Sequence, residues 1–439
     1  MALDDPNWDD SLSEHWVPLA PLFDTRLLIQ HLRRDWRLLQ RTDTILKECE
    51  LLRVHPRPEG GIFHYVVRLE RSGSETRREL FGEWVGTEAI SRCRELRWKL
   101  AKKRRKQIPR DERAEESVFC LPELGVVMRQ AGLDERLPGL RLIHDIPALR
   151  LHLASEGLAA EAQDVQVELL GHRPGKRCIV RIHLDRQASI IVKLYKQRSD
   201  KAGRVHALTA SLWKEGFDEA AAIRIPRPLG HYEPWRMVVM EDVALPPLIE
   251  ALERHDASPY ASVGEALAKL HRHVAPPVAA PHTAAHEIAL IRRNVTLTAN
   301  AFPALAHPLA RCLEQAVSAL ADDPGAPTVL AHRDFYEKQL FYDRGRVVLI
   351  DFDTTCFAEP AVDLGNFLAH LTLRRLQGMA IPETAETRFL QGYRVKDRHL
   401  MRRIDAYRRA TLLRLACLYA FRPAWRRLIG PLLRFSQRE

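Results

Sequence analysis

The sequence predicts an α+β protein whose strands come mainly in the first half and whose helices dominate the second. Short apolar runs separated by turn residues fill residues 49–85 and again residues 165–241, whereas helical periodicity prevails beyond residue 264. One β-hairpin interrupts the helical part at residues 340–350. At 439 residues the chain is too long for one ordinary hydrophobic core. We therefore expect three sections, at residues 1–155, 156–243 and 244–439.

The composition is that of a folded protein, with 46% hydrophobic and 28% charged residues. A net charge of +10 suits an anionic ligand such as a nucleotide, although arginine-rich proteins without such a ligand share it. The seven scattered cysteines argue against a disulfide framework or a zinc site. The acidic start lacks an apolar signal core, and no apolar run approaches the ~18 residues of a bilayer span. We expect a cytoplasmic protein with no membrane partner.

Residues 1–155 are expected to form an accessory α+β domain. The pattern predicts helices at 27–39 and 87–106 and strands at 49–54, 62–69 and 80–85. The second helix ends in the basic run 102–106, which suits either nucleic acid or a solvated helix end. Because no aromatic ladder for base stacking accompanies the run, nucleic acid is the less favoured partner.

Residues 156–243 are expected to form an antiparallel sheet with one helix against it. Strands are predicted at 165–170, 178–184, 188–195, 229–232 and 237–241, with a helix at 199–215. An Arg-Pro turn joins the first two strands here and also in the first section, and aligning the third strands places Glu83 opposite Lys193. Short β-turn-β units resemble one another easily, so a degenerate repeat and coincidence both stay open.

Residues 244–439 are expected to be mainly helical, with helices at 264–273, 309–320 and 364–376 and from 382 onward. The hairpin at 340–350 turns at Gly345 and brings the polar residues at its two ends together. Asp334, Gln339 and Asp351 should therefore converge. Because crowded carboxylates repel, a divalent cation with oxygen ligands is the expected partner of this cluster. Asp334 is the candidate base, able to orient a hydroxyl and accept its proton.

Two motifs carry a family resemblance, His332-Arg333-Asp334-Phe335 and Ile350-Asp351-Phe352-Asp353. Together they resemble the catalytic core of the aminoglycoside phosphotransferase and choline kinase family, whose members are related to protein kinases. The resemblance covers about residues 160–425. It implies a bilobal protein kinase-like fold, with an antiparallel β N-lobe and a mainly helical C-lobe. It also implies ATP or GTP as donor, Mg²⁺, and a small hydroxyl-bearing acceptor bound by helices in the ranges 284–320 and 382 onward. The extra N-terminal α+β domain lies outside the resemblance, and we expect it to cap the nucleotide lobe or to pack against it.

The resemblance also implies roles for individual residues. In the C-lobe, Asp334 matches the catalytic aspartate, Asp351 the Mg²⁺-binding aspartate and Gln339 the position of a metal-ligating asparagine. His332 and Asp363 match structural supports of the catalytic loop, whereas Asp353 is open between a supporting group and a turn residue.

In the N-lobe, Lys193 matches the strand lysine that contacts the α- and β-phosphates, unless it is simply an edge-strand lysine. The phosphate-loop cations are Arg173, Lys176 and Arg177, and the interlobe hinge comprises Met240, Glu241 and Val243. The glycine-rich loop and a mid-helix carboxylate to pair with Lys193 are both missing. An alternative is therefore a catalytically weak or inactive nucleotide-binding pseudokinase or scaffold.

Overall fold

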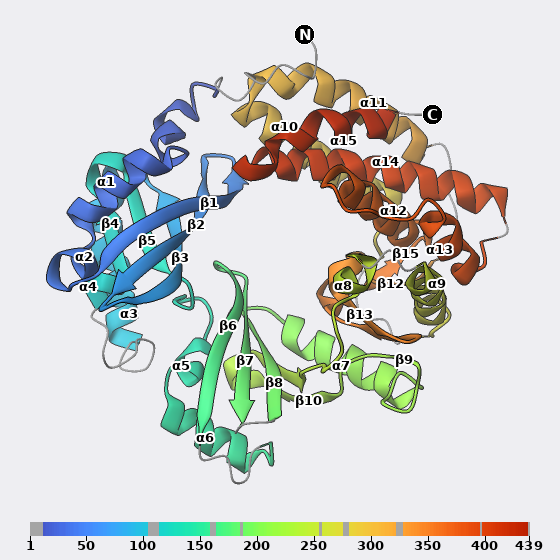
Figure 1. Ribbon diagram of the computed structural model, residues 1–439, viewed down its shortest axis with the longest axis horizontal. Coiled ribbons are helices and arrows are strands. Elements are labelled where there is room, and N and C mark those ends of the chain that lie inside the picture. The colour runs from blue at the N-terminus through green and yellow to red at the C-terminus, as the bar shows by residue number, and fades with distance from the viewer. Residues whose placement is uncertain are drawn as a thin grey trace.

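The computed structural model describes residues 12–103, 114–158, 164–184, 188–253, 257–274, 281–321, 328–395 and 397–437. Two five-stranded antiparallel sheets and a helical C-terminal part are arranged around a ring (Figure 1). The second sheet and the helical part are the two lobes of a protein kinase-like fold, and the first sheet is the core of an additional N-terminal α+β part. The predicted fold class is confirmed.

The first sheet has the strand order β1-β2-β3-β5-β4. Its strands are β1 (Ile45–Arg57), β2 (Gly60–Arg71), β3 (Ser74–Trp84), β4 (Val118–Leu121) and β5 (Val126–Gln130). The helices beside it are α1 (Thr25–Asp35), α2 (Arg37–Arg41), α3 (Ala89–Lys103) and α4 (Ala114–Ser117). The single helix predicted at 27–39 is instead two, because Trp36 is extended at their junction and its buried indole donates to the carbonyl of Glu116. The last residues of the basic run, 104–106, lie outside the described residues.

The second sheet has the strand order β6-β7-β8-β11-β10, the same connectivity as the first sheet. Its elements are β6 (Val165–Arg173), β7 (Arg177–Leu184), β8 (Ala188–Tyr195), α7 (Lys201–Lys214), β10 (Pro228–Tyr232) and β11 (Met237–Glu241). Glu83 lies between Ile62 and Val127 in the first sheet, as Lys193 lies between Ile179 and Val238 in the second. The repeat itself remains a prediction, supported by this shared strand order.

Two short helices pack on the second sheet, although their residues precede the sheet and belong to the first expected section, residues 1–155. They are α5 (Leu140–Ile143) and α6 (Ile146–Ser155). Leu140, Leu149 and Leu153 are buried in the same apolar cluster as the strand residues Val180 and Val192.

The C-lobe is helical around two small sheets. Its helices are α8 (Leu248–Glu253), α9 (Ser258–His271), α10 (Ala284–Ala301), α11 (Ala306–Ala321), α12 (Ala361–Leu376), α13 (Ala385–Tyr393), α14 (Arg398–Ala420) and α15 (Ile429–Gln437). One small sheet pairs β12 (Val329–Ala331) with β15 (Cys356–Ala358). The other has the order β13-β14-β9, from Leu340–Asp343, Arg346–Leu349 and Ile223–Arg224. Its strand β9 comes from the chain before the hinge, so it ties the two lobes together.

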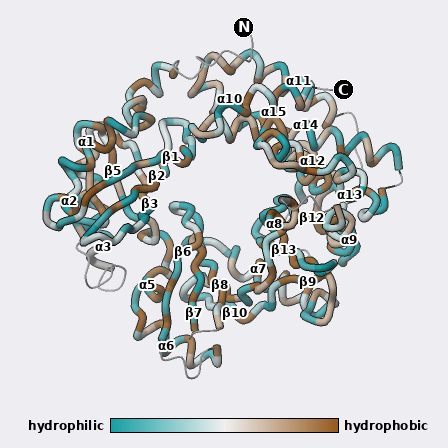
Figure 2. Tube along the Cα trace, in the orientation of Figure 1, coloured by the Kyte–Doolittle hydropathy of each residue, from teal (hydrophilic) through white to brown (hydrophobic). Residues whose placement is uncertain are grey.

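The N-terminal part closes the ring by contacting both lobes. It shares one apolar core with the C-terminal helices, in which the rings of Trp16 and Phe421 lie 5.6 Å apart, and the Val54 N–H donates to the Phe421 carbonyl at 2.8 Å. Toward the N-lobe, buried Asp134 accepts from the Gly175 N–H and lies 3.2 Å from His172 in the β6–β7 hairpin. Apolar residues concentrate along the strands and helices that form these cores (Figure 2). We expected contact with the nucleotide lobe; the shared core with the C-terminal helices was not foreseen.

Among the described helices, none is both long enough and apolar enough to cross a membrane.

Candidate active site

The β13–β14 hairpin brings two polar segments of the C-lobe together. Arg344 (φ 45°) and Gly345 (φ 84°) adopt the left-handed turn that matches the twist of paired strands. At the open end, the Ile350 N–H donates to the Gln339 carbonyl at 2.9 Å. The Gln339 side-chain amide in turn donates to Asp334 at 3.4 Å. The hairpin therefore places Asp334, Gln339 and Asp351 in one cluster, as its spacing predicts.

The loop that carries Asp334 is held by Asp363, near the start of α12. The two Asp363 oxygens accept the backbone N–H groups of His332 and Arg333, each at 2.7 Å. His332 then reaches across the site, with its Nε2 lying 2.8 Å from the Ile350 carbonyl. These contacts hold Arg333 in a left-handed conformation (φ 65°), which costs of order 1–3 kcal/mol for a non-glycine residue. Buried Asp363 and His332 therefore fix the conformation of the loop.

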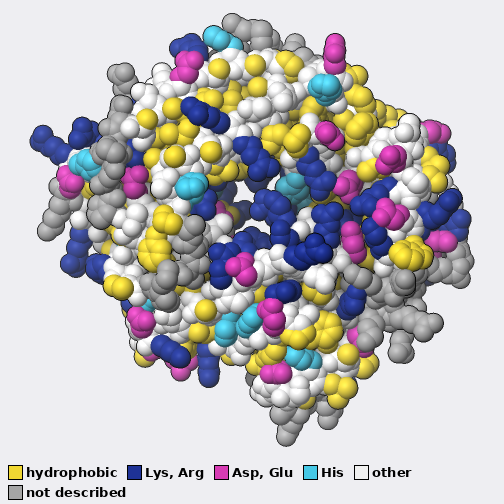
Figure 3. Space-filling view, turned by 180° about the vertical axis from the view of Figure 1, so that it is seen from behind, with side chains coloured by type: hydrophobic (Ala, Val, Ile, Leu, Met, Phe, Trp, Pro, Cys, Tyr) yellow, Lys and Arg dark blue, Asp and Glu magenta, His cyan; other side chains and the backbone are white. Residues whose placement is uncertain are grey.

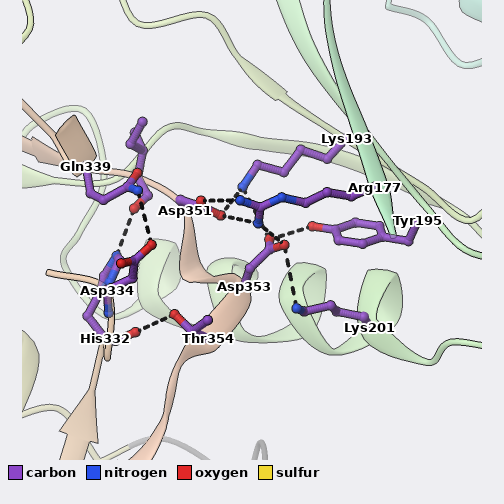
Figure 4. A network of polar contacts seen from close by, with 11 residues as sticks. Arg177, Lys193, Tyr195, Lys201, His332, Asp334, Gln339, Asp351, Asp353 and Thr354 are labelled. Atoms are coloured by element: carbon purple, nitrogen blue, oxygen red, sulfur yellow. Dashed lines mark hydrogen bonds and ion pairs between the residues drawn. The ribbon is translucent and has the colours of Figure 1, made fainter. Parts of the chain in front are cut away.

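Asp351 is neutralised by two cations from the N-lobe sheet (Figure 4). Lys193 donates to it at 2.7 Å, and the two terminal nitrogens of Arg177 donate to its two oxygens at 3.2 and 3.1 Å. Asp351 itself is left-handed (φ 64°), a conformation that turns the chain sharply after β14. The contact joins the two lobes directly.

Asp353 is the buried centre of the same network. It accepts from Tyr195 at 2.7 Å, from Lys193 at 3.3 Å and from Arg177 at 2.5 Å, and the Lys201 ammonium lies 3.7 Å away. Burial opposes its ionisation, but Lys193, Arg177 and Lys201 outweigh burial and hold the pKa of Asp353 well below its ordinary value. Of the two interpretations left open for Asp353, these contacts favour the supporting group.

Lys193 has no carboxylate partner on α7. Burial disfavours its charge, but Asp351 and Asp353 outweigh burial and raise the pKa of Lys193. Glu215, the carboxylate near the end of α7, instead accepts from Ser211 at 3.0 Å. The sequence correctly predicted that the middle of α7 has no carboxylate to pair with Lys193. It did not indicate that Asp351 and Asp353, after β14, take that place.

Asp334 lines the cavity from the loop between β12 and β13. Burial raises the pKa of Asp334, although the nearby Arg414 guanidinium partly opposes that rise. A half-buried carboxylate whose pKa is raised is suited to accept a proton from a hydroxyl.

The predicted hinge begins with the last two residues of β11 and continues beyond it. Met240 and Glu241 pair with β8, and Val243 comes two residues after the strand ends. The Glu241 side chain accepts from Arg224 at 2.7 and 2.8 Å, so its carboxylate braces the start of the hinge rather than facing a ligand.

The predicted phosphate-loop cations lie on the β6–β7 hairpin, where Gly175 (φ 69°) makes the turn. Arg173 and Arg177 line a cavity, whereas Lys176 does not. The neighbouring Arg173 and burial lower the pKa of Lys176.

The oxygen donors beside the cavity suit one kind of metal. The described residues contain no group of three or more His, Cys, Asp or Glu side chains that would hold a metal ion by itself. Asp351 and the Gln339 amide provide the small set of oxygen ligands typical of Mg²⁺ held largely by substrate phosphates and water. Because Arg177 and Lys193 now bind both Asp351 oxygens, a metal would have to displace one of these bonds. The oxygen ligands of Asp351 and Gln339 nevertheless fit Mg²⁺ in their chemistry.

A cavity of about 470 Å³ opens beside Asp334. Five chain segments line it: β1, the β6–β7 hairpin, α10, the loop that carries Asp334, and the stretch from α14 to residue 422. Three of its arginines were missed by the sequence analysis, Arg53, Arg414 and Arg422. They lie far from every motif, and nothing short of the tertiary contacts would have joined them to Asp334.

Known proteins resemble part of this chain. A model of the phosphotransferase enzyme family matches residues 179–407. No curated protein matches the chain. Among solved structures, the chain is similar to a choline/ethanolamine kinase family protein from Mesorhizobium loti, with 18% identity and a TM-score of 0.48, over 66% of this chain and 93% of that chain. It is also similar to a choline kinase from Cryptosporidium parvum, with 11% identity and a TM-score of 0.49, over 66% and 92% of the two chains.

Proposed function

The chain belongs to the phosphotransferase enzyme family, and we propose that it transfers the γ-phosphoryl group of ATP or GTP to a hydroxyl of a small acceptor, with Mg²⁺. The observation that carries the proposal is the convergence of Asp334, Gln339 and Asp351 with Lys193 at the junction of the lobes (Figure 4). Phosphoryl transfer depends mainly on positioning and electrostatic stabilisation, which such a cluster supplies.

Each member of the cluster has a role in the proposal. Asp334 orients the acceptor hydroxyl and takes its proton from its place on the cavity wall. Without nucleotide, Lys193 and Arg177 bind Asp351. When a nucleotide binds, the two cations move from Asp351 to its phosphates. Asp353 keeps Lys193 and Tyr195 in place throughout.

On the nucleotide side, Arg173 and Lys176 supplement the phosphate contacts from the β6–β7 hairpin. The backbone of Met240, Glu241 and Val243 borders the base. Asp351 and Gln339 would hold Mg²⁺, which when bound neutralises charge on the phosphates.

The test is Mg²⁺-dependent ADP release from the full chain with a library of hydroxyl compounds. Asp334→Ala should lower the rate on an identified acceptor by about 10²–10⁴-fold, the usual contribution of a positioned acid–base group. Glu383→Ala, an exposed carboxylate of the same lobe, is the matched control and should keep the wild-type rate. An Asp334→Ala protein with full activity would refute the role of Asp334, and a wild-type protein that binds no nucleotide with Mg²⁺ would refute the proposal as a whole.

One observation favours a second candidate, a nucleotide-binding protein with little or no turnover. Both oxygens of Asp351 are engaged by cations of the protein itself. If these bonds persist with nucleotide bound, Mg²⁺ lacks its main ligand. Thermal-shift titration with ATP, with and without Mg²⁺, separates the two: binding that Mg²⁺ does not strengthen, with no ADP released from any acceptor, supports the second candidate.

A further inference from the structure

We infer that the acceptor is itself a small anion, a hydroxyl compound carrying a phosphate or carboxylate group that Arg53, Arg414 and Arg422 bind beside Asp334. The inference rests on the proposed function, and it names the substrate class.

The cavity beside Asp334 is strongly cationic. Five arginines line it, and Asp334 is the only carboxylate among its described lining residues. Lys and Arg side chains gather around the central opening of the molecule (Figure 3). A volume of about 470 Å³ lies within the range of about 300–1,000 Å³ that small-molecule sites have. A site of this charge would repel a cationic acceptor and attract an anionic one.

Most of this positive charge is not neutralised within the protein. Arg177 pairs with Asp351 and Asp353. In the described part of the chain, no carboxylate forms an ion pair with the other four arginines of the cavity, Arg53, Arg173, Arg414 and Arg422. Burial and repulsion from Arg422 and Arg173 lower the pKa of Arg53, so the guanidinium groups crowd one another. An anion between them would relieve that repulsion.

The neutral contacts of these arginines leave hydrogen-bond donors for a ligand. Arg414 donates one terminal nitrogen to Asn366 at 2.7 Å, while its buried Nε has no partner among the described residues. Arg53 donates to His64 at 3.3 Å, and the Arg422 guanidinium lies 4.7 Å from the centre of the Tyr419 ring. Guanidinium forks match the geometry of phosphate and carboxylate groups.

Arg53, Arg414 and Arg422 are the cavity arginines that the proposed nucleotide contacts do not use. Arg177 and Lys193 occupy the side toward Asp351, where the nucleotide phosphates are proposed to bind. Arg414 instead lines the cavity together with Asp334 and lowers the pKa of that carboxyl. Arg53 comes from β1 of the N-terminal sheet, whose end is fixed to the C-lobe by the Val54–Phe421 backbone bond. The N-terminal part thus supplies one wall and one cation of the acceptor cavity.

The first experiment compares matched acceptors in the ADP-release assay: ribose with ribose 5-phosphate, glucose with glucuronate, and choline as a cation. We expect the anionic member of at least one pair to be preferred by tenfold or more in kcat/KM, and the two pairs distinguish phosphate from carboxylate. Arg53→Gln and Arg422→Gln should raise the KM of that acceptor by about tenfold, the usual effect of losing one charged hydrogen bond. Arg402→Gln, an exposed arginine of α14 outside the cavity, should not change it.

A second experiment needs no turnover. Inorganic phosphate is titrated into the full chain at low salt, with and without Mg²⁺-ADP, and binding is read as a thermal shift. Phosphate should bind the wild type and Arg402→Gln alike and bind Arg53→Gln and Arg422→Gln about tenfold more weakly. Phosphate affinity that is equal in all four proteins, or a preference for neutral or cationic acceptors, overturns the inference while leaving phosphotransfer intact. Arginine-dependent phosphate binding without any binding of Mg²⁺-ATP refutes the proposed function instead.

Discussion

Replacing Asp353 by asparagine removes one charge from the buried network and keeps the shape of the side chain. In the wild type, Asp351 and Asp353 face Lys193, Arg177 and Lys201, two negative charges against three positive. In Asp353→Asn one negative charge faces the same three cations. The excess positive charge of the network therefore rises from one to two.

The cost follows from burial. The Asp353 side chain is only 1% exposed and Lys193 only 6% exposed, so water cannot replace the lost charge. Removing one partner of a buried ion pair costs about 3–5 kcal/mol of unfolding free energy. Because Arg177 and Lys201 are 25% and 32% exposed and partly solvated, we expect a loss near the lower end, about 3 kcal/mol.

The loss should depend on pH in a defined direction. The pKa of Asp353 is depressed in the folded chain, so its stabilisation is fully present above the unfolded-state pKa of about 3.9 and is lost as pH falls toward the folded-state value. The difference in unfolding free energy between wild type and Asp353→Asn should therefore be constant from pH 6 to 8 and shrink below about pH 4.

Urea denaturation followed by tryptophan fluorescence measures this difference. Asp43→Asn makes the same chemical change at an exposed position and should lie within about 0.5 kcal/mol of wild type. The reasoning is refuted if Asp353→Asn is as stable as this control at pH 7, or if their difference grows as the pH falls.

Three further predictions concern the loop, the packing and the base. Burial raises the pKa of Asp334, and only its ionised form accepts a proton. As the pH is lowered, kcat should therefore fall with an apparent pKa above the ordinary aspartate value of about 3.9. A kcat that stays constant down to pH 4 would contradict this. Gly264→Ala should lower the melting temperature, because its Cβ would lie 2.2 Å from the Phe389 carbonyl, whereas Gly203→Ala, with no contact under 3.4 Å, should be neutral or stabilising. Asp363→Ala removes the acceptor of the His332 and Arg333 N–H groups, at a cost of about 1–3 kcal/mol for each unsatisfied group. Hydrogen exchange in the loop of residues 332–334 should therefore accelerate and kcat should drop, and unchanged exchange would show that the Asp363 bonds are not needed.

Local patterns were sufficient for most of the architecture. Turn chemistry and apolar spacing located the β13–β14 hairpin, and the fixed geometry of a hairpin then placed Asp334, Gln339 and Asp351 together. Strands β4 and β5 escaped because four- and five-residue segments carry too little periodicity to be distinguished from loops. The interruption at Trp36 escaped because it depends on a hydrogen bond to a residue 80 positions away.

The sequence by itself determined the α+β class and the hairpin that brings Asp334, Gln339 and Asp351 together, because both depend on short-range pattern. The roles of these residues and of Lys193 stay predictions. Only the tertiary structure decided that Lys193 pairs with Asp351 and Asp353, and that Arg53, Arg414 and Arg422 surround Asp334. These contacts join strands and helices that are far apart along the chain. Short-range sequence patterns do not predict how the ring closes, because closure depends on the burial of apolar residues of the N-terminal part against those of the C-terminal helices.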